Sequence, residues 1–279
     1  MSETLRATFR RVLRLENRRT AIRPGRLERI HGFESRILGN AREVTIYLPA
    51  GYDEHTELGR RYPVLYMQDG QNLFDAERAY IPGQHWRMKE AADAAIGERT
   101  AEAMIIVGVD HAGVGRMDEY TPVRDAKHNG GGRADEYVRM LSEELKPVID
   151  ERFRTIGDAA HTGIGGSSLG GLATLHAILT RSDVFGRGAA MSPSVWWGEK
   201  AILQEVDAYT GPPPRLWVDI GGREGLEALE DAHALRDRLH AKGWTDETFR
   251  YHEDRRADHS ERAWARRARM VLEFLFPPA

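Results

Sequence analysis

The chain has 279 residues, of which 41% are hydrophobic and 30% are charged, and its formal net charge is −3. This composition is typical of a globular protein with a sizeable core, and the small net charge gives no reason to expect a nucleic-acid or membrane partner. The chain contains no cysteine, which excludes disulfide bonds, thiolate catalysis and thiolate metal sites. No segment is apolar enough to span a bilayer, and the N-terminal residues lead into further charge rather than into an apolar signal core. We therefore expect a cytoplasmic protein.

Strand-like and helix-like segments alternate along the chain, which predicts an α/β fold with a mostly parallel central sheet and helices on both faces. We expect strands at 44–48, 64–67, 104–109, 161–165, 188–191, 216–220 and 248–252, and helices at 134–149, 172–179, 226–242 and 260–276. Pro147 should kink or end the first of these helices, and Gly243 should end the third. We expect a single domain over residues 1–279, with residues 1–40 as an N-terminal edge extension that turns into the first core strand at Gly39-Asn40.

The most informative segment is Gly166-Ser167-Ser168-Leu169-Gly170, which lies between a predicted strand and a predicted helix. It matches the pattern Gly-x-Ser-x-Gly, in which a serine lies on a sharp, strained strand-to-helix turn and exposes its hydroxyl. Glycines two positions before and after the serine remove side chains that would collide across the turn. Ser167 lacks this spacing, because the residue two positions after it is Leu169. Ser168 is therefore the candidate nucleophile.

A serine hydroxyl needs a base to take its proton, and the base needs an acid that orients it. In this type of fold the chain order is serine, acid and histidine, and such groups gather at the carboxyl ends of the strands. His259 follows the last predicted strand and is the candidate base. Glu224 follows the preceding strand, in Gly221-Gly-Arg-Glu-Gly225, and is the candidate acid. The alternative role of Glu224 is that of a carboxylate at a helix N-terminus.

A tetrahedral intermediate needs two backbone donors for its oxyanion. One should be the amide of Leu169, directly after the nucleophile. The other should be the amide of Gln71, in a turn where Gly70 lets the backbone approach the site. Trp196 and Trp197 follow a predicted strand end and, with Gly70, are candidates to line the substrate pocket. The alternative is that the two tryptophans belong to the core.

Together these segments resemble the "Putative esterase" family of α/β hydrolases, which includes enterochelin and bacillibactin esterases and esterase D-like enzymes. The resemblance is carried by residues 42–52, 65–75, 116–122, 165–171, 191–197 and 259–264. It implies an α/β-hydrolase fold and a serine hydrolase in which Ser168 and His259 match the nucleophile and the base. The third member varies within the family, which leaves the role of Glu224 open. Gln68 departs from the pattern, because relatives often carry histidine before Asp-Gly.

The sequence thus predicts a serine carboxylic ester hydrolase that acts through an acyl-enzyme on a small ester, either a siderophore trilactone or a short-chain acyl ester. One alternative is an acyltransferase that uses the same serine and histidine, and another is a catalytically silent hydrolase fold that binds a ligand. We expect no cofactor and no metal, and a small-molecule ester as the partner. No phosphate-loop or zinc-helix motif competes with this interpretation.

Overall fold

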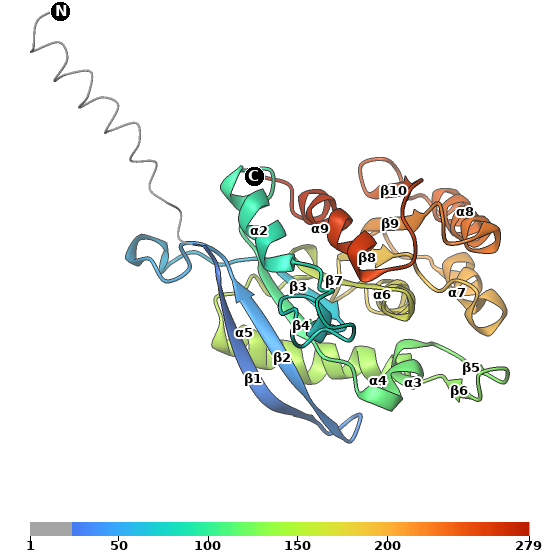
Figure 1. Ribbon diagram of the computed structural model, residues 1–279, viewed down its shortest axis with the longest axis horizontal. Helices are drawn as coiled ribbons and strands as arrows, with labels where there is room; N and C mark the ends of the chain where they lie inside the picture. Colours follow the sequence, from blue (N-terminus) through green and yellow to red (C-terminus); the bar gives the residue numbers. More distant parts are fainter. Residues whose placement is uncertain (1–23, 279) are drawn as a thin grey trace, which may run out of the picture.

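The computed structural model describes residues 24–278, so the expected extension over residues 1–40 is described only from residue 24 onward. An eight-stranded sheet forms the centre, in the spatial order β1-β2-β4-β3-β7-β8-β9-β10 (Figure 1). Its strands are β1 (Arg26–Ser35), β2 (Asn40–Leu48), β3 (Val64–Gln68), β4 (Ile105–Val109), β7 (Thr162–Ser167), β8 (Arg187–Met191), β9 (Arg215–Gly221) and β10 (Phe249–Asp254). β2 is antiparallel to both β1 and β4, and all other neighbours are parallel. The predicted mostly parallel sheet is confirmed.

Helices cover both faces of this sheet. They are α2 (Met88–Gly97), α3 (Arg116–Tyr120), α4 (Ala134–Arg139), α5 (Lys146–Arg152), α6 (Leu169–Thr180), α7 (Trp197–Ala208), α8 (Leu226–Ala241) and α9 (Glu261–Leu275). In Figure 1, α2 and α9 lie side by side, while α4 to α8 pack on the opposite face. A separate two-stranded hairpin pairs β5 (Arg124–Asp125) with β6 (Gly130–Gly131). Within residues 24–278, no helix combines the length and the apolar character needed to cross a bilayer.

The alternation of side chains along the strands distributes the core over both faces. In β3, Val64 and Tyr66 belong to the cluster that packs against α4 to α8, whereas Leu65 and Met67 belong to the cluster that packs against α2 and α9. All four side chains are at most 1% exposed. Because both faces of β3 are buried, the strand is a continuous apolar run, as expected for a central strand of a parallel sheet.

The helical segment after residue 133 shows how the chain accommodates Pro147. α4 leads into a π-helical stretch, Met140–Leu145, which leads into α5 with Pro147 in its first turn. Proline has no amide hydrogen, so it cannot donate the backbone hydrogen bond that an α-helix would make at this position. The wider π turn that precedes Pro147 accommodates the absence of this bond. The predicted kink is therefore a change of helix type, and the helix continues to Arg152 instead of ending near Ile149.

The parallel strands bring four loops to one edge of the sheet, because the carboxyl ends of parallel strands point the same way. The loops that follow β3, β7, β9 and β10 carry Gln71, Ser168, Glu224 and His259. The loops after β9 and β10 lead into α8 and α9, which are both predicted from the sequence. α8 ends before Gly243, whose φ is 97°, and the side chain of Ser260 caps the start of α9. The topology thus gathers residues that lie far apart in the sequence.

Gly70 packs so closely against β4 that a side chain does not fit. A Cβ at this position would lie 2.4 Å from the carbonyl carbon of Gly108 and 2.6 Å from the amide nitrogen of Val109. We expect Gly70→Ala to lower the free energy of unfolding by about 1–3 kcal/mol, because the backbone must shift to make room. Gly97→Ala in α2 is the matched control, since nothing lies within 4 Å of its Cβ position and alanine favours a helix. Chemical denaturation measures both variants, and equal stabilities would contradict the predicted contact.

Candidate active site

Ser168 lies on the sharp turn between β7 and α6, in the strand–turn–helix context that its motif predicts. Its φ of 57° and ψ of −121° are strained for a residue with a side chain. The Ser168 amide donates a hydrogen bond of 3.0 Å to the carbonyl of Met191, which ties the turn to β8. A Cβ at Gly166 would lie 3.0 Å from the carbonyl carbon of Gly170 and 2.5 Å from Oε1 of Gln68. The glycine therefore lets the two arms of the turn close over the buried Gln68.

His259 and Glu224 form a short hydrogen bond between the loops that follow β10 and β9. Nδ1 of His259 lies 2.6 Å from Oε2 of Glu224. The glutamate side chain is 3% exposed and the imidazole 44%, so the pair has one buried end and one open end. Burial raises the pKa of Glu224, but hydrogen bonds from His259 and Ser192 outweigh it and hold the pKa below its usual value. An ionised Glu224 requires Nδ1 to donate, which leaves Nε2 of His259 as an acceptor.

A buried network fixes the other oxygen of Glu224. Its Oε1 accepts hydrogen bonds from Ser192 Oγ at 2.6 Å and from the amide of Gly221 at 2.7 Å. Ser192 Oγ in turn accepts from Trp264 Nε1 and Arg267 Nη2, each at 3.1 Å. Ser192 and Arg267 are not predicted from the sequence, because a serine in a Ser-Pro-Ser turn and an arginine inside a helix match no motif. The signal that could have found Ser192 is its position directly after a strand of the parallel sheet.

Asp219 lies inside β9 and belongs to this network. Its carboxylate is fully buried and lies 3.0 Å from the guanidinium of Arg267, which is 1% exposed. Burial raises the pKa of Asp219 in spite of the neighbouring arginine. The same carboxylate accepts from the amide of Ser192 at 3.1 Å. Of the two carboxylates at this end of β9, Glu224 is therefore the one that contacts His259.

The turn after β3 is held by two residues of α3, Arg116 and Tyr120. Asp69 adopts a left-handed conformation (φ 55°, ψ 46°) ahead of the 3₁₀ turn η2 (Gly70–Asn72). Arg116 donates from Nε and Nη2 to the two carboxylate oxygens of Asp69, each at 2.7 Å. The amide of Asp69 donates to the hydroxyl of Tyr120 at 3.2 Å. These bonds fix the backbone of a turn that would otherwise be strained.

Two backbone amides beside this site have no acceptor. Leu169 is the first residue of α6, where an amide has no partner within the helix. Gln71 lies in η2, and its side-chain Oε1 accepts from the amide of His111 at 3.4 Å. Among the hydrogen bonds that residues 24–278 make, none is donated by the backbone amide of Leu169 or Gln71. Both amides are available to a ligand.

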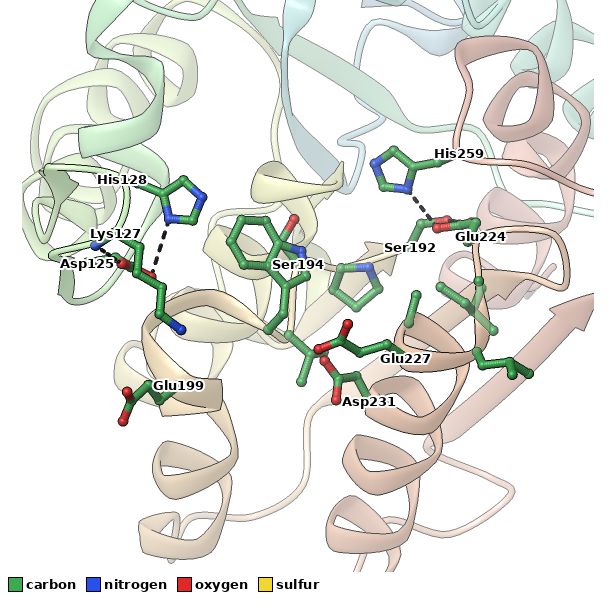
Figure 2. Close-up of a pocket in the computed structure, with 17 residues that line it drawn as sticks. Asp125, Lys127, His128, Ser192, Ser194, Glu199, Glu224, Glu227, Asp231 and His259 are labelled. Carbon is green, nitrogen blue, oxygen red and sulfur yellow. Dashed lines mark hydrogen bonds and ion pairs between the residues drawn. The ribbon is translucent and has the colours of Figure 1, made fainter.

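Two cavities meet at His259. The smaller, of about 380 Å³, is lined by both Ser168 and His259. The larger, of about 700 Å³, is lined by His259, Glu224 and Ser194 and reaches toward α7 and α8 (Figure 2). Ser194 Oγ lies 3.4 Å from Ser168 Oγ, so the two cavities adjoin at these hydroxyls. A ligand bound at Ser168 can therefore extend in two directions.

The residues predicted to line the pocket divide into two groups. Trp196 lines the larger cavity and is 42% exposed. Gln71, which is predicted as an oxyanion donor, lines the smaller cavity. Trp197 is 1% exposed, and its indole Nε1 donates to the carbonyl of Val123 at 2.7 Å. Trp197 is thus a core residue, contrary to the expectation. Gly70 lines neither cavity, because its lack of a side chain serves the contact with β4.

The sequence of this chain is similar to those of known esterases. A family model described as Putative esterase matches residues 35–272. Uncharacterized protein YbbA of Bacillus subtilis is 26% identical over 247 residues, which cover 84% of this chain and 92% of that protein. Ferri-bacillibactin esterase BesA of Bacillus subtilis is 30% identical over 182 residues, which cover 63% of this chain and 62% of that protein.

A solved structure extends the comparison to the fold. The BES protein from Bacillus cereus has a TM-score of 0.71 at 21% identity, and the match covers 91% of this chain and 95% of that one. The family model runs from the end of β1 into α9 and so includes every loop of the site. The chain therefore belongs to the Putative esterase family and is a carboxylic ester hydrolase with an α/β-hydrolase fold.

Proposed function

We propose that this chain hydrolyses esters through a serine nucleophile and an acyl-enzyme. Ser168 is the nucleophile, His259 the base and Glu224 the acid that orients the base. The observation that carries the proposal is the 2.6 Å hydrogen bond between His259 Nδ1 and Glu224, with His259 on the same cavity as the strained Ser168.

In the first half of the reaction, Nε2 of His259 accepts the proton of Ser168 Oγ as this oxygen attacks the ester carbonyl. The amides of Leu169 and Gln71 stabilise the oxyanion, and each such donor lowers the activation free energy by about 3 kcal/mol. The tetrahedral intermediate then expels the alcohol, which leaves with the proton from His259. In the second half, a water molecule gives a proton to His259 and attacks the acyl-enzyme. As the second tetrahedral intermediate collapses, His259 passes this proton to Ser168 Oγ, which releases the carboxylic acid and restores the hydroxyl.

The substrate that we propose is an ester with bulky groups on both sides of the bond that is cleaved. Cavities of about 380 and 700 Å³ open from the site and support this assignment. In the larger one, the exposed indole of Trp196 lies 5.2 Å from the ring of His128 and offers an aromatic surface. A siderophore ester fits this shape, and a ferri-bacillibactin esterase is among the relatives.

The charge of the larger cavity favours an iron-free ester over its ferric complex. Asp231 in its lining is paired with Lys200 at 2.5 Å. A ferric catecholate complex is anionic, and like charges repel strongly in a partly enclosed site. Besides Glu224 and the paired Asp231, the cavity is lined by the carboxylates of Asp125, Glu199 and Glu227, against the one lysine Lys127.

Removal of the nucleophile tests the proposal directly. We expect Ser168→Ala to lower kcat for 4-nitrophenyl butyrate by more than about 1,000-fold, because the remaining groups cannot form an acyl-enzyme. A fluorophosphonate probe should label the wild type and not this variant. Ser142→Ala is the matched control, since Ser142 bonds to the carbonyl of Val138 within a helix and lines neither cavity. Retained turnover in Ser168→Ala, or a wild type that cleaves no ester, would contradict the proposal.

Substitution of the acid tests the orientation of the base. In Glu224→Gln the amide can donate to Nδ1 of His259 and hold the imidazole in the tautomer that cannot accept the Ser168 proton. We expect kcat to fall by about 100-fold or more, with little change in KM. A variant with wild-type kcat would show that Ser168 and His259 act without Glu224.

The same variant should change the dependence of stability on pH. The pKa of Glu224 lies below its usual value of 4.5 in the folded protein, so the group stabilises the fold above about pH 4.5. This contribution disappears as the pH falls through the lower pKa of the folded state. We expect Glu224→Gln to lack it, as measured by urea unfolding between pH 3 and 6, whereas parallel curves for the two proteins would argue against an ionised Glu224.

Trp196 is expected to select aromatic esters. We expect Trp196→Ala to raise KM about tenfold for methyl ferulate or phenyl butyrate, because stacking contributes about 1 kcal/mol or more. The KM for methyl butyrate should not change, and Trp196→Phe should retain most of the preference. Equal effects on all three esters would show that Trp196 does not contact the substrate.

A further inference from the structure

Glu261 lies between the loop that carries His259 and the turn that carries Gln71. It is the first residue of α9 and follows His259 by two positions. Its Oε1 accepts a hydrogen bond of 3.1 Å from Nδ2 of Asn72, and its Oε2 accepts from the indole Nε1 of Trp86. The carboxyl also lines the smaller cavity. Glu261 thus connects the loop of His259 with the turn that carries Gln71.

The other hydrogen bonds of this turn stay within the N-terminal half of the chain. Asn72 accepts on its carbonyl from the amide of Trp86 and on Oδ1 from the amide of Tyr80, each at 2.8 Å. Gln71 Oε1 accepts from the loop after β4. Among the hydrogen bonds of residues 24–278, those from Asn72 and Trp86 to Glu261 are the ones that link residues 69–86 to α9. The other hydrogen bonds between the N-terminal half and α9 lie beyond the end of α2, where Thr100 donates to Glu273 and Arg269 donates to Glu98.

We infer that Glu261 is a positioning residue that holds the turn of Gln71 against the loop of His259. The oxyanion donor and the base then keep a fixed separation, although they come from opposite ends of the chain. This inference rests on the proposed function, because it assigns Glu261 a role in the reaction of Ser168. The expected loss of activity is large enough to measure, since a misplacement of a catalytic group by about 1 Å lowers the rate about 100-fold.

The carboxyl of Glu261 is held at a cost to stability. Burial raises its pKa to about 7, and the charge of Asp69 adds to this, while the bond from Trp86 and the charges of Arg116 and His259 oppose it. Because this pKa lies above the usual value of 4.5, the group destabilises the folded protein progressively as the pH rises from about 4.5 to about 7. A glutamine removes this cost. If Glu261 is a positioning residue, its replacement by glutamine should lower activity without lowering stability. A purely structural role predicts that both fall together.

The experiment measures Glu261→Gln and Glu261→Ala in the full chain, with 4-nitrophenyl butyrate at pH 8. Glutamine can accept one of the two hydrogen bonds and alanine neither, so we expect kcat to fall about 10-fold and about 100-fold respectively. KM should stay within about twofold, because Glu261 acts through Asn72 and Trp86. By urea unfolding, Glu261→Gln should be at least as stable as the wild type at pH 8, with the difference shrinking toward pH 5.

Two controls separate positioning from general damage. Arg262→Gln alters an exposed neighbour on the same helix and should leave kcat and KM unchanged. A trifluoromethyl ketone, which mimics the tetrahedral intermediate, should bind each Glu261 variant more weakly in proportion to its loss of kcat.

The outcomes distinguish this inference from the proposed function. If the wild type cleaves the ester and both Glu261 variants keep kcat within about twofold, the inference is overturned and the proposed function stands. If Glu261→Gln loses stability and activity together at pH 8, the role is structural and the inference is overturned. If the wild type cleaves no ester, both fail. If Glu261→Ala does not fold, Glu261→Gln alone decides.

Discussion

A hydrogen bond of 2.6 Å between His259 and Glu224 joins two loops whose residues lie 35 positions apart in the chain. It depends on β9 and β10 being parallel neighbours, because their carboxyl ends then place the loops that follow them side by side. The carboxylate is anchored from behind by Ser192, which is held in turn by the buried Arg267. The imidazole is therefore oriented from the protein interior, and His259 lines the cavity that Ser168 also lines.

The strained turn at Ser168 also depends on the strands and the helix that surround it. A residue at φ 57° persists only where neighbouring structure leaves it no alternative. β7 is paired on both sides, with β3 and β8, and the close contact of Gly166 with Gly170 lets α6 start immediately after the strand. The sheet thus stabilises a turn that carries the serine at its edge, and α6 begins directly after it with an amide that has no partner within the helix.

The features that could be predicted from sequence are those encoded by residues close together in the chain. The Gly-x-Ser-x-Gly spacing predicts the turn at Ser168, and Gly243 predicts the end of α8, because each depends on local backbone geometry. α2 escapes prediction, since its ten residues bury only Met88, Ala92 and Ala95 and so carry a weak apolar stripe. Trp196 and Trp197 are adjacent and chemically identical, yet one lines a cavity and the other fills the core.

By itself, the sequence determined the class of fold, the strained serine, and the order in which candidate nucleophile, acid and base follow the strands. Only the tertiary structure decided that the candidate acid Glu224 contacts His259, that Ser192 holds the second oxygen of Glu224, and that Glu261 accepts a hydrogen bond from Asn72. The reason is physical. A turn or a helix end depends on the dihedral angles and hydrogen bonds of a few consecutive residues, whereas a contact between distant side chains depends on how the whole sheet and its helices pack.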